Sequence, residues 1–299
     1  MDSGRPMLMF KNKWVKTSLV CLYCLTVLAG CSPPATLRHN GGAYVLDRSH
    51  SSEAQNARIR FLIFHYTAVD LPTSLKLLTG EEVSAHYLIS DEISGRSGLA
   101  VVYPLVREDR RAWHAGVSHW NGRTGLNDTS IGIEIVNPGF TENMLGRKTW
   151  YSYSEPQISA LAALAKEIIR RHGITPDNVL AHSDIAPLRK QDPGVLFPWK
   201  ALAIQGVGAW PDPQRVCRYL AGRAPDAPAD ILTLQTALRR YGYDETPLTG
   251  ELDEDTRKII SAFQMHFRPD NIDGLPDAET AAIAQALIDQ YRPAPRSPL

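Results

Sequence analysis

The stretch Ile59-Arg60-Phe61-Leu62-Ile63-Phe64-His65-Tyr66 is an almost unbroken apolar run with one imidazole near its end. Short apolar runs of this kind are typical of strands buried on both faces of a sheet. Further strands are predicted over 84–90, 101–105, 130–136 and 179–181. Apolar residues at helical spacing predict a helix over 155–172, which Gly173 ends. Strands and helices mixed in this way predict an α/β sheet covered by helices.

Length and charge limit what the chain can be. It has 299 residues, with Lys+Arg 32 against Asp+Glu 32. The length suggests about two domains, at roughly 100–200 residues each. The balanced charge gives no basic excess of the kind that nucleic-acid binding requires, so we expect no nucleic-acid partner.

The first thirty residues are predicted to be a signal peptide. Lys11, Lys13 and Lys16 precede an apolar stretch that is too short to span a bilayer, which takes about 20 apolar residues. It ends Leu28-Ala29-Gly30-Cys31, which resembles the lipobox of bacterial lipoproteins. The resemblance implies cleavage before Cys31, lipid attachment there, and sorting to the outer membrane, facing the periplasm. An ordinary signal anchor that is never cleaved is the alternative.

Two further segments are predicted, a tether before the larger domain and a helical module after it. Residues 31–57 are rich in Pro, Ser, Asn and Gly and are predicted to be a tether. A Pro/Ala linker over 221–230 separates residues 58–218, the predicted larger domain, from a predicted three-helix domain over 229–292. Its helices are expected over 231–241, 253–267 and 277–291. About 60 residues can form only a modest core.

The run from His182 to Pro193, His-Ser-Asp-Ile-Ala-Pro-Leu-Arg-Lys-Gln-Asp-Pro, carries the clearest chemistry. Its prolines predict a loop rather than a helix. An imidazole at His182 and a carboxylate at Asp192 suit zinc, and a catalytic zinc takes three protein ligands and one open position. We expect the third ligand to be His65, at the end of its strand. A satisfied core histidine is the alternative for His65.

Two further ionisable groups have candidate catalytic roles. Glu134 lies in the apolar run Ser130–Val136, where burial would raise its pKa and suit it to proton transfer. Lys190 would stabilise an oxyanion near the metal. The alternatives are a solvated strand residue for Glu134 and a solvated loop lysine for Lys190. His86, Trp113 and His114 are weaker candidates, because a histidine beside an aromatic residue suits a sugar or peptide groove but also ordinary packing.

Four motifs together resemble a known family, the zinc-dependent N-acetylmuramoyl-L-alanine amidases of the type-2 amidase family. The motifs are Phe64-His65-Tyr66-Thr67, Ala112-Trp113-His114-Ala115-Gly116, Ile131-Gly132-Ile133-Glu134-Ile135-Val136-Asn137, and His182-Ser183-Asp184-Ile185-Ala186-Pro187 with Lys190 and Asp192. The resemblance covers about residues 58–215. It implies the fold of peptidoglycan recognition proteins, a mixed central β-sheet flanked by helices.

The resemblance also implies a role for each matching residue. His65, His182 and Asp192 would bind one Zn²⁺, Glu134 would be the general base and acid, and Lys190 would stabilise the oxyanion. Asn137 is assigned to substrate binding with His86, Trp113 and His114. Leu188 stands where many relatives place Gly, a departure that touches no ligand. The C-terminal segment resembles a three-helix peptidoglycan-binding domain; a small structural appendage is the alternative.

The function that follows is hydrolysis of the amide bond between N-acetylmuramic acid, or its anhydro form, and the L-alanine of the stem peptide. The expected partners are peptidoglycan or muropeptide fragments and, through its anchor, the outer membrane; we expect a monomer. Two alternatives are a non-catalytic peptidoglycan receptor and a zinc peptidase that cuts within the stem peptide. Receptors typically lack a complete zinc set, and this chain keeps all three ligands.

Overall fold

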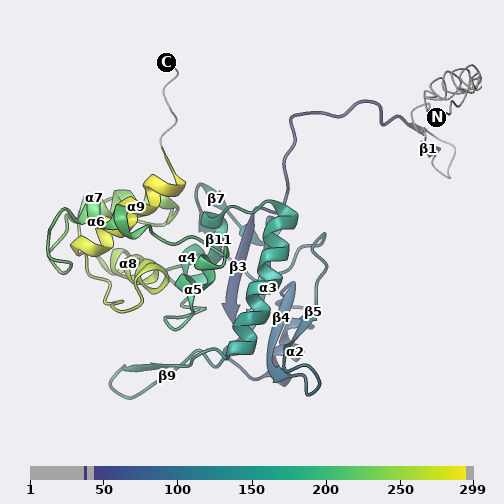
Figure 1. Ribbon diagram of the computed structural model, residues 1–299, viewed down its shortest axis with the longest axis horizontal. Coiled ribbons are helices and arrows are strands. Elements are labelled where there is room, and N and C mark those ends of the chain that lie inside the picture. Colours follow the sequence, from purple (N-terminus) through teal and green to yellow (C-terminus); the bar gives the residue numbers. More distant parts are fainter. Residues whose placement is uncertain (1–36, 39–43, 294–299) are drawn as a thin grey trace, which may run out of the picture. The chain divides into compact units, whose positions relative to one another are not determined.

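The computed structural model describes residues 37–38 and 44–293 (Figure 1). The predicted signal peptide and Cys31 lie outside the described residues. The chain divides at Asn56 into a short N-terminal unit and a large unit that begins at Ala57. In the short unit, β1 (Leu37–Arg38) pairs antiparallel with β2 (Val45–Leu46).

A five-stranded mixed sheet forms the centre of the large unit. Its order is β11-β3-β8-β4-β5. The strands are β3 (Phe61–Tyr66), β4 (Tyr87–Ile93), β5 (Ala100–Pro104), β8 (Ser130–Ile135) and β11 (Val179–Ala181). The first four strands in this order are parallel, and β5 pairs antiparallel with β4 at the edge. The predicted mixed sheet flanked by helices is confirmed.

Strand β3, which lies between β11 and β8, is buried on both faces, as its sequence predicts. Leu62 and Phe64 belong to the core on which α3 (Glu155–His172) packs, whereas Phe61 and Ile63 belong to the core on the other face. Successive side chains of a strand point to opposite faces. His65 therefore continues the face of Phe61 and Ile63.

Helix α3 has the bounds that the sequence predicts. Ser154 and Gln157 form a capping box at its start. Gly173 ends it in the left-handed conformation, with φ of 65°, which glycine adopts without steric cost. The helix α2 (Leu71–Leu78) was not predicted, although Asp70 caps it and its proline lies in the first turn, where proline is tolerated.

Several short elements connect these layers. They are β6 (His119–Trp120), β7 (Arg123–Thr124), β9 (Phe140–Glu142), β10 (Lys148–Trp150), the 3-10 turns Leu126–Asp128 and Pro176–Asn178, α4 (His182–Ile185) and α5 (Trp199–Ile204). The prediction of a loop from His182 onward was wrong for its first turn. Pro187 disfavours helix for the residue before it, which leaves 182–185 free to form one turn.

Four helices pack together at the C-terminal end. They are α6 (Pro213–Leu220), α7 (Ile231–Tyr241), α8 (Glu254–Phe267) and α9 (Ala278–Tyr291). The three helices after the linker were predicted; α6 was not, and it packs on α9. One apolar core joins these helices to the sheet, since Phe61 and Ile63 cluster with Tyr243 and Phe263. The helical region therefore shares its core with the larger domain.

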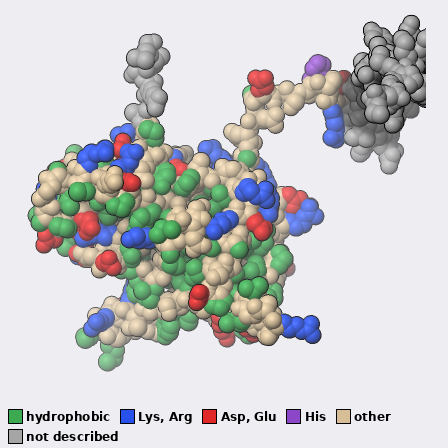
Figure 2. Space-filling model, viewed as in Figure 1, with side chains coloured by type: hydrophobic (Ala, Val, Ile, Leu, Met, Phe, Trp, Pro, Cys, Tyr) green, Lys and Arg blue, Asp and Glu red, His purple; other side chains and the backbone are tan. Residues whose placement is uncertain are grey.

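The surface agrees with the balanced composition. Figure 2 shows basic, acidic and apolar side chains interspersed over the visible face. Cys217 is exposed and makes no disulfide with any described residue. Within residues 37–38 and 44–293, no helix combines the length and apolar character that crossing a membrane would demand.

Candidate metal centre and active site

The site lies where three parallel strands end side by side. In the register, His65 on β3 faces Glu134 on β8, and Phe64 faces Ala181 on β11. Because side chains alternate along a strand, His65 and Glu134 point to the same face of the sheet. His182 directly follows β11 and begins α4. The sheet thus brings together residues that lie more than a hundred positions apart.

His65, His182 and Asp192 form one cluster. The Nδ1 atoms of the two histidines lie 3.0 Å apart, and each lies 3.0 Å from Oδ2 of Asp192. All three residues are buried, and they are the group of the described chain that has metal-ligand geometry. The structure therefore brings together the three residues that the sequence predicts as metal ligands.

The charge states of the cluster suit a cation. Burial, followed by the charge of His182, lowers the pKa of His65 to about 4. Burial raises the pKa of Asp192, but the neighbouring imidazoles of His182 and His65 outweigh it and hold that pKa well below its ordinary value. A neutral imidazole and an ionised carboxylate are the forms that bind metal.

A relay of side chains fixes the orientation of His65. Its Nε2 lies 3.0 Å from Nδ1 of His114, and Nε2 of His114 lies 3.1 Å from Oγ of Ser130. The hydroxyl of Ser130 donates to the carbonyl oxygen of Leu126. Because the hydroxyl of Ser130 donates to a carbonyl, its oxygen accepts from Nε2 of His114, and Nδ1 of His114 accepts from Nε2 of His65. The proton of His65 is therefore on Nε2, and the lone pair of Nδ1 points to the cluster.

A glycine makes room for this relay. Gly132 lies on β8 directly beside the ring of His114, and a Cβ at this position would come within 2.4 Å of its Cγ. No such distance occurs between real carbon atoms that are not bonded. The space that Gly132 leaves is therefore a requirement for the position of His114.

Backbone carbonyls and amides fix the other half of the cluster. Nε2 of His182 lies 3.2 Å from the carbonyl oxygen of Ala115 and 3.4 Å from the guanidinium of Arg189. The carbonyl is the nearer of the two and can only accept, so we assign the proton to Nε2 and the lone pair to Nδ1. Arg189 donates to the same carbonyl and to that of Val117. The amide of Ser183 donates to the carbonyl oxygen of Asp192 at 3.0 Å, which ties α4 to the other cluster residue of this loop.

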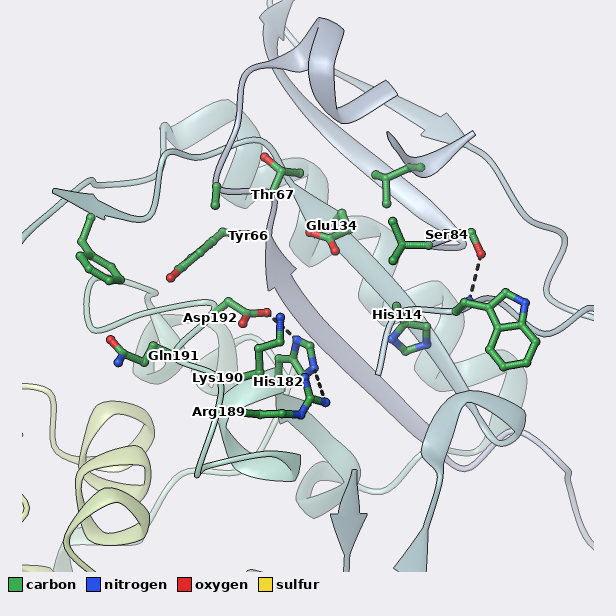
Figure 3. Close-up of a pocket in the computed structure, with 15 residues that line it drawn as sticks. Tyr66, Thr67, Ser84, His114, Glu134, His182, Arg189, Lys190, Gln191 and Asp192 are labelled. Atoms are coloured by element: carbon green, nitrogen blue, oxygen red, sulfur yellow. Dashed lines mark hydrogen bonds and ion pairs between the residues drawn. The ribbon is translucent and has the colours of Figure 1, made fainter. Parts of the chain in front are cut away.

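A cavity of about 380 Å³ opens beside the cluster. Figure 3 shows Glu134, His182, Lys190 and Asp192 gathered around it. Burial, followed by the charge of Asp192, raises the pKa of Glu134 well above its ordinary value, although Lys190 opposes the shift. Oε2 of Glu134 is buried without a hydrogen-bond partner among the described residues. This oxygen is therefore available to a proton or to a substrate.

The predicted substrate-binding residues divide into two pairs. Trp113 and His114 line the cavity. His86 and Asn137 do not: His86 is fully buried and bonds Gly132 N and Arg110 O through its two ring nitrogens. The amide of Asn137 bonds three backbone groups. The polar atoms of both side chains are thus engaged in holding the backbone.

Sequence reasoning missed several residues of the cavity. They are Tyr66, Thr67, Ala68, Leu78, Val83, Ser84, Phe140, Arg189 and Gln191. Two of them, Arg189 and Gln191, flank the predicted Lys190, and Tyr66 and Thr67 directly follow the predicted ligand His65, so their place in the sequence was the available signal. Ser84 and Phe140 could not be predicted as cavity residues, because no local sequence pattern distinguishes them and only the fold brings them to the cavity.

Comparison with known proteins places this geometry in a family. The family described as N-acetylmuramoyl-L-alanine amidase matches residues 55–195, and the family described as putative peptidoglycan binding domain matches residues 228–283. The N-acetylmuramoyl-L-alanine amidase AmiD of Escherichia coli is 49% identical over 265 residues, which cover 89% of this chain and 95% of the relative. The 1,6-anhydro-N-acetylmuramyl-L-alanine amidase AmpD of Enterobacter cloacae is 41% identical over 118 residues, which cover 40% of this chain and 57% of the relative.

Solved structures agree over most of the chain. The complex of E. coli AmiD with anhydro-N-acetylmuramic acid-L-Ala-D-gamma-Glu-L-Lys matches with a TM-score of 0.81 at 49% identity, covering 86% of this chain and 98% of that one. AmpDh3 of Pseudomonas aeruginosa in complex with anhydromuramic pentapeptide matches with a TM-score of 0.73 at 43% identity, covering 87% and 100%.

Proposed function

This chain belongs to the N-acetylmuramoyl-L-alanine amidase family, and from that premise we propose how its site works. It is an amidase that hydrolyses the bond between N-acetylmuramic acid and the L-alanine of the peptidoglycan stem peptide. The two solved relatives in complex carry anhydromuramic peptides, so we propose that this chain also accepts the anhydro form.

We infer that His65, His182 and Asp192 hold one Zn²⁺. A single observation carries this inference: three lone pairs converge at 3.0 Å, because the other nitrogen of each imidazole is engaged elsewhere. Such lone pairs repel one another unless a cation or a proton lies among them. Two imidazoles and a carboxylate are a donor set of catalytic zinc. Bound zinc would polarise the scissile carbonyl and lower the pKa of water.

Glu134 is proposed as the general base and then the general acid. Its raised pKa brings the carboxyl closer to neutrality, where a group both accepts and returns protons efficiently. The free and buried Oε2 would take the proton of the attacking water. The same carboxyl would then deliver the proton to the nitrogen of the leaving L-alanine.

Lys190 is proposed as the group that stabilises the oxyanion. Its ammonium lies on the loop between His182 and Asp192 and lines the cavity. No hydrogen bond or ion pair joins Nζ of Lys190 to any described residue. A preorganised cation that is not already paired is suited to the negative charge that develops on the carbonyl oxygen.

The remaining proposals concern placement. We propose a signal peptide over 1–30, lipidation at Cys31, a tether over 31–57, and an outer-membrane lipoprotein that faces the periplasm. The amidase domain would span 58–218, and the helical domain over 229–292 would bind peptidoglycan, as the family match over 228–283 supports. The chain would act as a monomer.

Product analysis tests the proposed activity against its two rivals. Muropeptides incubated with the protein would be resolved by mass spectrometry. Free sugar and an intact stem peptide are expected, since the cut falls at the lactyl amide. Shortened stem peptides would instead support a peptidase, and unchanged muropeptides would support a non-catalytic receptor.

A further inference from the structure

A buried carboxylate outside the proposed ligand set, Asp184, lies two residues after His182. Asp184 belongs to α4, the single helical turn that begins with the ligand His182. Its exposed fraction is 1%. A carboxylate removed from water in this way costs free energy unless hydrogen bonds replace its hydration. The donors that satisfy Asp184 therefore decide whether α4 can hold its position.

Two of the donors come from the C-terminal helical region. The hydroxyl of Tyr243 donates to Oδ1 at 2.6 Å, and Nδ1 of His266, on α8, donates to Oδ2 at 2.7 Å. The third donor is local, the amide of Ala181 at 2.7 Å. Burial, and then the charge of Asp184, raises the pKa of Tyr243 well above its ordinary value, so the phenol stays protonated and donates.

His266 is itself held rigidly. The rings of Trp199 and Phe267 stack on it, with centroids 3.7 Å and 3.9 Å away. Trp199 also stacks against Phe64, the residue that precedes the ligand His65 on β3. The imidazole therefore bonds Asp184 and, through the ring of Trp199, packs toward strand β3.

The position of α4 explains why these bonds concern the metal. Figure 1 shows α4 between the sheet and the C-terminal helices, and it contacts β3, β11 and α8. Within one helical turn, the carboxylate of Asp184 accepts from the amide of Ala181, which precedes His182. A shift of Asp184 would move the backbone from which His182 reaches the cluster, and with it the bond from Ser183 to Asp192.

We propose that Tyr243 and His266 are positioning residues for the metal site, so that the C-terminal helical region completes the amidase centre as well as flanking it. The proposal rests on the proposed ligand set. It assigns the helical region a role that the match to a peptidoglycan-binding family does not include. Hydrogen bonds made directly to metal ligands alter metal affinity or activity by about 10–100-fold when they are removed, and we expect bonds that act through Asp184 to fall at the lower end of that range.

The test uses the mature full-length protein and four variants. Tyr243→Phe removes one hydroxyl, and His266→Leu removes the ring donor. His266→Asn restores an N–H close to the place of Nδ1. Tyr241→Phe is the matched control, because Tyr241 is an equally buried tyrosine of the same region that packs on Trp120, as Tyr243 does, and makes no bond to Asp184. Near-ultraviolet circular dichroism establishes that each variant is folded.

The readouts are zinc affinity, measured by competition with a chelator, and kcat and KM on an anhydromuropeptide. Tyr243→Phe and His266→Leu are expected to bind zinc about tenfold more weakly than the wild type and to have a lower kcat with an unchanged KM. Tyr241→Phe is expected to match the wild type. His266→Asn is expected to recover part of the loss seen in His266→Leu. If His266→Leu does not fold, Tyr243→Phe decides. Wild-type zinc affinity and kcat in Tyr243→Phe and every folded His266 variant would overturn the proposal. A wild-type protein that binds no zinc would instead refute the ligand set.

Discussion

The two halves of the metal site are held in place by different means. His65 and Glu134 belong to neighbouring strands, and the register of the ladder sets both at once. His182, Lys190 and Asp192 follow the last strand, and individual hydrogen bonds hold their loop to Ala115, Val117 and the C-terminal helical region. The strand half is therefore the more robust to change at a distance, and the loop half depends on contacts made by residues far along the chain.

The largest effect is expected in the strand half, from Glu134→Gln. The amide cannot take the proton of the attacking water, so turnover should fall by about 10²–10⁴-fold. Glu134 is not a ligand, so zinc content by elemental analysis should stay near that of the wild type. A variant with turnover within threefold of the wild type would remove Glu134 from the mechanism.

In the loop half, Lys190→Met should reduce kcat by about 10²-fold, because an oxyanion would lose one preorganised partner. Lys148→Met is the control, because Nζ of Lys148 already donates a hydrogen bond to Oε1 of Gln191 and lies over the ring of Phe140. Steady-state kinetics should show a small change for the control. Equal losses in the two variants would mean that a general positive charge, and not Lys190 itself, assists the reaction.

A smaller effect is expected from changing the residues that hold His65 in the strand half, where His114 bonds its ring. Gly132→Ala would displace His114 from its bond to His65, and zinc affinity should fall by about tenfold. Ile133→Val, on the same strand but in the core on which α3 packs, should bind zinc as the wild type does. Chelator competition measures both. Unchanged affinity in Gly132→Ala would show that the relay through His114 does not support the ligand.

The smallest effect concerns stability away from the site. Burial raises the pKa of Glu108, but hydrogen bonds from Arg171, Tyr87 and His172 outweigh it and lower the pKa to about 2. Because the folded pKa lies below its ordinary value, this stabilisation is complete above about pH 4.5 and is lost as the pH falls toward 2. In excess chelator, the Tm of the wild type should decrease more between pH 5 and pH 3 than the Tm of Glu108→Gln does. Equal losses would contradict this.

The sequence predicted the parts that follow from local rules. The apolar periodicity and caps of residues 155–172 predicted the bounds of α3, and the chemistry of the His182–Asp192 run predicted two of the three residues in the metal-capable cluster. His65 was found because strand ends gather at one edge of a sheet. The catalytic and substrate roles of these residues stay predictions.

What the sequence could not give depends on distant contacts. His86 and His114 look alike in the sequence, yet the ring of His86 bonds two backbone groups and the ring of His114 bonds His65. The partners of Asp184 lie 59 and 82 residues away, across a Pro/Ala linker that suggested independent domains. Only a shared core, which no local pattern encodes, brings them together.

The most direct test of the central claim is the zinc content of purified His65→Ala beside the wild type, measured by elemental analysis after dialysis. We expect one zinc per wild-type chain and a large loss in the variant, because the strand half would then contribute no ligand to the loop half. A variant that retains one zinc per chain would contradict the account.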